Sequence, residues 1–130
     1  MREETKNLIE QAKKDLEVAE KNFNLEEYYM TAFLCQQCTE KILKAFFIIT
    51  NGRSAGQTHS LIYLAKETNV PKEFYDFLGS LTPEFITTRY PDVAGDAPYK
   101  LYHKEKVQPY IEKTKKLVTW IEKKIEKQQN

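Results

Sequence analysis

The stretch LEEYYMTAFLCQQCTEKILKAFFIIT, residues 25–50, decides the fold because its spacing predicts one long helix that is apolar on two sides. The first apolar stripe consists of Cys35, Cys38, Ile42, Ala45, Phe46 and Ile49. The second stripe consists of Tyr29, Phe33, Leu43 and Phe47. A helix that is apolar on two sides needs two packing partners. We expect its own bundle to supply one partner and a second subunit to supply the other.

Polar residues interrupt this helix between its two apolar stripes. Gln36, Gln37, Glu40 and Lys44 recur at helical spacing and form a polar ladder. Such residues are seldom placed on a helix that is otherwise committed to packing. The ladder therefore indicates a role beyond packing.

Cys35 and Cys38 form a C-x-x-C pattern inside the same helix, on its apolar face. A redox motif would need a strand–helix context, and a zinc site would need two further ligands in a chain with only two histidines. We expect two buried thiols that behave as small apolar groups, in a reducing compartment, and we expect no bound metal.

The flanking sequence predicts further helices. Residues 3–22 have the period of an amphipathic helix. A short helix is expected within residues 58–68, and one or two further helical turns are expected after Pro71. In TPEFITT, Thr82 is expected to cap a helix that begins at Pro83. Residues 104–127 form the last helix. The fold class is therefore all-α, a four-to-five-helix up-and-down bundle in a single domain over residues 1–130.

Composition excludes several classes of protein. The chain has 130 residues and a net charge of +1, so it carries no overall polyanion-binding signature. It has no leader-like start and no apolar run near the length of a membrane span, and we expect a cytoplasmic protein. Residues 103–130 hold eight Lys and four Glu. This excess is typical of a solvated helix face, and the alternative is a weak phosphate-attracting patch.

The connection TTRYPDVAGDAPYKLYH, residues 87–103, concentrates polar chemistry where no helical period is found. Arg89 offers a planar fork suited to carboxylate or phosphate, and Asp92 or Asp96 can take that fork. The rings of Tyr90, Tyr99 and Tyr102 can stack on a base or cover the core. The residues by themselves favour a strap that ties two helices together, with a ligand site as the close alternative.

Four motifs resemble the HEPN domains, whose name stands for higher eukaryotes and prokaryotes nucleotide-binding. The motifs are DLEVA (15–19), EYYMTAFLCQQCTEKILKAFF (27–47), THSL (58–61) and TTRYPD (87–92). The resemblance implies a helical bundle that usually forms a homodimer or a higher homo-oligomer. It also implies a prokaryotic protein that acts with a minimal nucleotidyltransferase, as a toxin–antitoxin or nucleotide-handling pair.

Many HEPN proteins are metal-independent ribonucleases, with Arg, four to six residues and then His at the start of the last helix. Here Arg53 and His59 have that spacing, but they lie between the second and third predicted helices. At the expected place, the first histidine after Arg89 is His103, which is too far along. The imidazole that the mechanism needs for proton transfer is missing there. We therefore expect no catalytic residue and no ribonuclease activity.

The resemblance favours a nucleotide-binding site around Arg89. In this hypothesis Arg89 holds a phosphate of an ATP-like nucleotide and Tyr90 or Tyr102 lies against the base. The remaining candidate ligand-binding residues are Gln37, Glu40 and Lys44, which would line the cleft, together with His59 and Asp92. No cofactor, metal or membrane is expected, and RNA binding has no support in these motifs.

Two alternatives stay open. One is a ribonuclease with a variant site around Arg89 and His103 or around Arg53 and His59. The other is a helical dimerisation module that binds no ligand.

Overall fold

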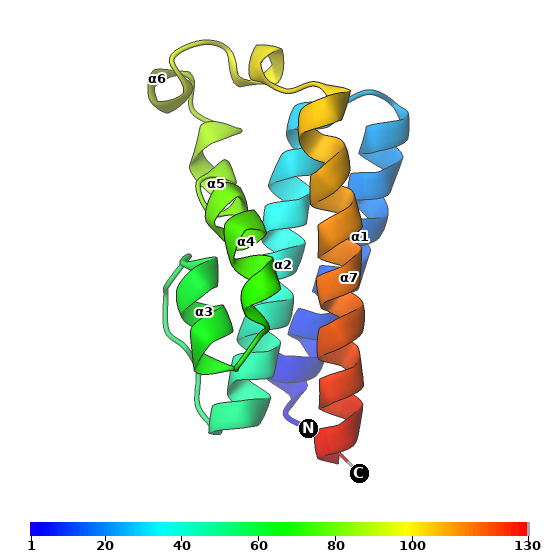
Figure 1. Ribbon diagram of the computed structural model, residues 1–130, viewed down its shortest axis with the longest axis vertical. Coiled ribbons are helices and arrows are strands. Elements are labelled where there is room, and N and C mark those ends of the chain that lie inside the picture. The colour runs from blue at the N-terminus through cyan, green and yellow to red at the C-terminus, as the bar shows by residue number, and fades with distance from the viewer. Residues whose placement is uncertain (130) are drawn as a thin grey trace.

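The computed structural model describes residues 1–129 and confirms the predicted all-α bundle, with no strand in that range (Figure 1). Three long helices lie side by side, namely α1 (Glu3–Asn24), α2 (Tyr28–Asn51) and α7 (Lys104–Gln129). The shorter elements are α3 (Leu61–Glu67), the 3₁₀ helix η1 (Lys72–Phe74), α4 (Tyr75–Leu81), α5 (Glu84–Thr87), α6 (Pro91–Ala94) and the 3₁₀ helix η2 (Pro98–Leu101). Figure 1 shows α3, α4 and α5 as a layer on one side of α2.

Helix α2 lies at the centre and packs against other elements of this chain on both of its apolar sides. On one side, the ring of Phe46 meets Trp120 of α7 edge-on, with ring centroids 5.9 Å apart. On the other side, Phe47 packs against Tyr63 of α3 at 6.4 Å and is fully buried. The α3–α5 layer therefore covers Leu43 and Phe47 of the second stripe, whereas Tyr29 and Phe33 stay half-buried, and a second subunit remains an expectation.

The end of α2 and the start of α3 are set by two local signals. Gly52 adopts a left-handed conformation, with φ of +72°, and its N–H donates to the Ile48 carbonyl at 2.8 Å. Glycine reaches this conformation without the steric cost that a Cβ would bring. Ser60 then accepts a hydrogen bond from the backbone N–H of Tyr63 and caps α3. The intervening segment, residues 53–59, contacts α2 at both of its ends, through Arg53 over the ring of Phe47 and through His59 on Glu40.

The predicted cap at Thr82 was wrong. Thr82 has helical dihedral angles, and its hydroxyl donates to the Leu78 carbonyl at 2.8 Å, so it continues the end of α4. Helix α5 begins at Glu84 without a side-chain cap. The predicted last helix is confirmed, and it runs through Pro109 without a break.

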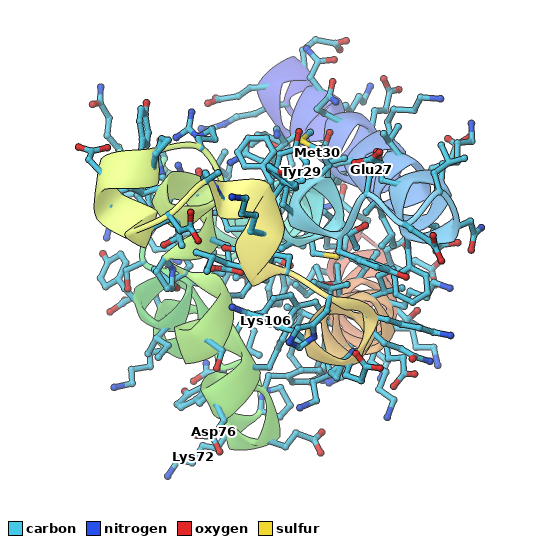
Figure 2. The ribbon with its side chains drawn as sticks, turned by 90° about the horizontal axis from the view of Figure 1, so that it is seen from above. Glu27, Tyr29, Met30, Lys72, Asp76 and Lys106 are labelled. Atoms are coloured by element: carbon cyan, nitrogen blue, oxygen red, sulfur yellow. The ribbon has the colours of Figure 1, made fainter. Side chains whose placement is uncertain are left out.

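The connection between α5 and α7 is more ordered than its sequence indicates. It contains α6 and η2, and α6 ends at Gly95, which is left-handed with φ of +83°. The view from above shows η2 crossing the end of the bundle between the α4–α5 layer and α7 (Figure 2). Tyr102, directly after η2, is buried and donates from its hydroxyl to Glu84 Oε1 at 3.0 Å. This contact fastens the connection to α5.

Both cysteines are fully buried on the α1–α7 side of α2. Burial raises the pKa of Cys35 to about 12, and it raises the pKa of Cys38 further. Within residues 1–129, no group of three or more His, Cys, Asp and Glu residues has the arrangement of a metal site. Over the same residues, every helix is too short or too polar to cross a lipid bilayer.

We predict that Cys35 and Cys38 are inert in the native protein. A thiolate is the reactive species, and burial disfavours it at both positions. A chromogenic disulfide reagent at about pH 8 should label neither thiol until urea unfolds the chain, when both should react. The control is Ser54→Cys, because Ser54 is exposed and its replacement should react at once. Rapid labelling of the unmodified native chain would contradict the buried arrangement.

Candidate functional site

Arg89 lies two residues after the end of α5 and is held by aromatic residues. Its Nε donates to the Phe85 carbonyl at 2.6 Å. Its guanidinium carbon lies 5.4 Å from the ring centroid of Phe33 and 5.2 Å from that of Tyr90. Both distances suit a cation–π interaction, which orients the side chain while leaving its charge unneutralised. Arg89 itself is exposed.

The carboxylate partners expected for Arg89 do not pair with it. The structure has no ion pair between Arg89 and any carboxylate of residues 1–129, and Asp96 instead accepts from the backbone N–H of Ala97 at 2.8 Å. Asp92 is exposed in the first turn of α6. The connection of residues 87–103 is therefore fastened by the hydrogen bond between Tyr102 and Glu84. The guanidinium of Arg89 is available to an external anion.

A cleft of about 370 Å³ lies beside Arg89. Its lining residues come from the start of α2, the end of α5 and η2, namely Glu27, Tyr29, Thr88, Arg89, Pro98 and Tyr99. Figure 2 shows Glu27 and Tyr29 at the end of the bundle that η2 crosses. The cleft thus combines one guanidinium, one carboxylate and two phenol rings. These groups can bind a phosphate, a hydroxyl or amine donor, and a planar ring, respectively.

The polar ladder of α2 forms an internal network around Glu40. Glu40 Oε1 accepts from Gln36 at 3.0 Å and lies 2.8 Å from His59 Nδ1, and Oε2 accepts from Lys44 at 3.1 Å. Burial alone would raise the pKa of Glu40, but the hydrogen bonds from His59, Lys44 and Gln36 outweigh burial and hold the pKa below its ordinary value. The carboxylate is therefore ionised and well compensated.

The same network continues from α2 to α1. Gln37 donates to Gln36 at 2.7 Å and accepts from Lys41 at 3.2 Å, and Lys41 also contacts Asp15 at 2.8 Å. Each of these side chains is at least partly buried. Since the ladder is satisfied internally, its evident role is to join α1, α2 and the segment before α3.

His59 links this network to Arg89. An ionised carboxylate can only accept, so the bond to Glu40 places a proton on Nδ1 of His59. The imidazole is half-exposed and stacks on Phe85, with ring centroids 4.3 Å apart and planes 24° apart. The carbonyl of Phe85 holds Arg89. His59 and Arg89, which are 30 positions apart in the sequence, therefore contact the same residue.

The predicted site residues fall into separate places. Arg89 lines the cleft and Tyr90 supports its guanidinium, whereas Gln37, Glu40, Lys44 and His59 belong to the internal network and do not line the cleft. Tyr102 is buried against Glu84, and Asp92 lies on α6. The guanidinium carbon of Arg53 lies 5.1 Å from the ring centroid of Phe47, whereas His59 stacks on Phe85. Arg53 and His59 therefore pack on different aromatic residues.

Sequence reasoning missed most of the cleft lining and the joining residue Phe85. The sequence placed Glu27 and Tyr29 in or beside the second helix and Thr88 and Pro98 in the connection, without a ligand-binding role, whereas Tyr99 was named as a ring that could stack on a base. One signal was present: Phe85 lies four residues before Arg89, which is one helical turn.

Glu84 is a second buried carboxylate, and it is poorly compensated. It is 4% exposed, its Oε1 accepts from Tyr102, and its Oε2 has no hydrogen-bond partner among residues 1–129. Burial raises the pKa of Glu84, although the Tyr102 hydroxyl and the charge of Lys106 act in the opposite direction. Ionised Glu84 therefore costs stability at the point where the connection is fastened.

The comparisons with known proteins agree with this architecture. The family model described as HEPN domain matches residues 5–125. This chain therefore belongs to the HEPN domain family. Among proteins with curated descriptions, none matches it.

Two solved structures are similar to this chain over nearly its full length. One is TT1696 from Thermus thermophilus, with 26% sequence identity and a TM-score of 0.83, covering 95% of this chain and 99% of that chain. The other is ST0689, described as an archaeal HEPN homologue, with 28% identity and a TM-score of 0.80, covering 96% of this chain and 99% of that chain.

We predict that Glu40→Gln destabilises the protein at pH 7 by about 1–3 kcal/mol, because buried hydrogen bonds to a charged group are lost. The folded pKa of Glu40 is lowered, so its stabilisation is present above the ordinary value of 4.5 and is lost as the pH falls through the folded pKa. The difference in free energy of unfolding should shrink in acid. Urea unfolding at about pH 7 and pH 3 measures it, with exposed Glu17→Gln as the control that should change little. An equal loss at both pH values would contradict this assignment.

We predict the opposite sign for Glu84→Gln. The folded pKa of Glu84 is raised, so the native state loses stability as the pH rises from 4.5 through that pKa. The amide keeps an acceptor for Tyr102 without the buried charge, so Tm at pH 7 should rise by about 3–5 °C, equivalent to about 1 kcal/mol. Tyr102→Phe, which removes the one donor to Glu84 found among residues 1–129, should lower Tm. Calorimetry of both variants that showed Glu84→Gln less stable at pH 7 would contradict this account.

Proposed function

We propose that this HEPN protein is a non-catalytic binding module that holds the phosphate of an ATP-like nucleotide at Arg89. In this proposal it acts as a homo-oligomer in the prokaryotic cytoplasm and regulates a minimal nucleotidyltransferase, in a toxin–antitoxin type of pair. The observation that carries the nucleotide proposal is the guanidinium of Arg89, which is held by Phe85, Phe33 and Tyr90 beside a cleft and has no carboxylate partner among residues 1–129.

The chemistry of the cleft favours a nucleotide over a bare phosphate. A single guanidinium gives a bidentate contact to one phosphate group. Glu27 in the same cleft repels a highly charged anion but accepts hydrogen bonds from a ribose hydroxyl or an exocyclic amine. The rings of Tyr29 and Tyr99 offer stacking surfaces, and about 370 Å³ lies within the usual size of small-molecule sites.

The absence of an imidazole from the cleft lining supports a binding role. His59 is engaged by Glu40 through Nδ1, and His103 is exposed beside Glu105, 3.5 Å away. Neither histidine belongs to the residues that line the cleft within the described chain. A general acid or base must reach the proton that it transfers.

A protein partner has support from the connection that carries α6 and η2. Tyr90, Val93 and Tyr99 are 46%, 58% and 62% exposed, and all three belong to that connection. Large apolar groups gathered on one exposed segment are typical of a protein contact. Family membership supports a second copy or a nucleotidyltransferase as the occupant.

One observation favours a ribonuclease as the second candidate. The bond to Glu40 orients the imidazole of His59 and leaves Nε2 free to transfer a proton, while Phe85 brings His59 and Arg89 into one neighbourhood. This candidate requires RNA cleavage that His59→Ala abolishes.

We predict that calorimetric titration detects an adenosine nucleotide at millimolar or lower concentration and that Arg89→Ala removes the binding. Arg89→Lys keeps the charge but loses the planar fork, and it should weaken binding by about tenfold. Arg53→Ala is the matched control, because Arg53 is also exposed and rests on an aromatic ring but lies outside the cleft.

Two results would contradict the nucleotide proposal. The first is that titration with ATP, ADP or AMP gives no heat and that Arg89→Ala changes only the thermal stability. Arg89 would then have a structural role in the connection of residues 87–103. The second is RNA cleavage that His59→Ala abolishes, which would replace the binding module by the ribonuclease.

A further inference from the structure

The exposed residues of α7 are sorted by charge around the helix. With about 100° per residue, the four glutamates of α7 lie on the side toward α1 or at its border. That side forms ion pairs with α1, since Glu122 contacts Lys13 at 3.0 Å and Lys115 contacts Glu20 at 3.0 Å. Glu122 and Lys115 thus join this side of α7 to α1, while the other three glutamates make no ion pair with α1 within residues 1–129.

The opposite side of α7 is a basic stripe. It lies within about 100° of arc and extends for about 30 Å, at about 1.5 Å per residue. Its members are Lys106, Lys113, Lys116, Trp120, Lys123, Lys124 and Lys127. None of these six lysines forms an ion pair with a carboxylate of residues 1–129. Within the described residues, the stripe therefore presents ammonium groups without ion pairs along most of the last helix, although Lys106 also lies over the ring of Tyr102 and its charge acts to lower the pKa of Glu84.

The basic stripe runs beside two hollows between α7 and the shorter helices. The first, of about 270 Å³, is lined by Lys106 and Lys113 with Asp76 and other residues of α4 and α7, and Figure 2 shows Lys106 between α4 and α7. The second, of about 190 Å³, is lined by Trp120 and Lys124 with residues of α2 and of the turn after α3. A polymer that follows the stripe would thus lie in a shallow furrow.

We propose that the basic stripe of α7 binds the sugar–phosphate backbone of a nucleic acid without reading its sequence. A row of lysines supplies point charges to successive phosphates, and the stripe contains no Arg or Asn suited to bidentate contact with base edges. This surface is distinct from the Arg89 cleft, to which none of its residues belongs.

The pattern of exposed apolar residues favours a nucleic acid over an anionic membrane. A helix that lies on a membrane buries large apolar side chains beside its lysines. Among residues 1–129, the exposed large apolar side chains are Met1, Leu25, Tyr63, Tyr90, Val93 and Tyr99, and α7 has none of them. Trp120 is half-buried, with its ring against Phe46 and the ammonium of Lys124 5.3 Å from its centroid.

Trp120 makes the proposal measurable, because it is the only tryptophan of the chain and lies within the stripe. We predict that a single-stranded RNA of about 20 nucleotides changes its fluorescence and binds in an anisotropy assay at low salt. With about four phosphate contacts, affinity should fall about 50-fold between about 50 and 200 mM salt, since each contact adds about −0.7 to the logarithmic slope. The same assay is run in parallel with single-stranded DNA of the same sequence and with the RNA and DNA duplexes.

The decisive variant replaces Lys113, Lys116, Lys123 and Lys127 by Gln. Its control replaces Lys6, Lys13, Lys14 and Lys21 of α1 by Gln, which changes the net charge equally on another face. The stripe variant should lose binding at least about tenfold with an unchanged Tm, and the α1 variant should bind as the unmodified chain does. Equal losses in the two lysine variants, no binding at about 50 mM salt, or binding to phosphatidylserine vesicles without nucleic acid would overturn the proposal.

Discussion

Burial of α2 on both of its apolar sides is the constraint on which the rest of the structure depends. One side is covered by α1 and α7, and the other by the layer of α3, α4 and α5. Leu43 and Phe47 of the second side are fully buried, and Tyr29 and Phe33 nearer the start of the helix are half-buried. Each fully buried side chain stabilises the fold by about 1.5–3 kcal/mol. The short helices α3, α4 and α5 therefore shield one apolar side of α2 from water. Since His59 precedes α3 and Arg89 follows α5, the position of this layer sets the positions of both residues.

The two buried carboxylates, Glu40 and Glu84, differ in how well hydrogen bonds compensate their charge. Glu40 is surrounded by donors from three side chains and is held ionised, so it cross-links α2 to the segment before α3. Within the described part of the chain, Glu84 has one donor and one oxygen without a partner, so its ionisation opposes folding. Because Tyr102 is that donor, the attachment of the connection over the end of the bundle depends on Glu84. The cleft beside Arg89 uses Pro98 and Tyr99 of the same connection as a wall, which couples the stability of the strap to the shape of the site.

Membership of the HEPN family and the two similar structures establish the architecture, whereas the chemistry of this chain depends on its own residues. Two surfaces stand out, and they differ in kind. The Arg89 cleft has one planar cation with aromatic walls, which suits a small ligand with one phosphate contact. The α7 stripe has many mobile point charges in a line, which suits a polymer. Their separation allows a small ligand and a nucleic acid to bind independently.

The sequence by itself determined the helices and their buried faces. A period of about 3.6 residues is a local property, so residues 25–50 and 104–127 read correctly as buried helices, and Gly52 marked the end of α2. The same local signals predicted the all-α class and the buried thiols. Local signals could not show that helices of the same chain pack against the second apolar stripe. That packing depends on how α3, α4 and α5 fold back onto α2.

Only the tertiary structure decided the site. Contact between His59, Phe85 and Arg89 joins segments that are far apart in the chain, and no local period encodes such a meeting. The choice of Phe33 and Tyr90 over Asp92 as neighbours of Arg89 is likewise a matter of packing, because any of these groups is chemically able to accompany a guanidinium. Residue types limit which interactions can form, and the arrangement of the helices selects among them.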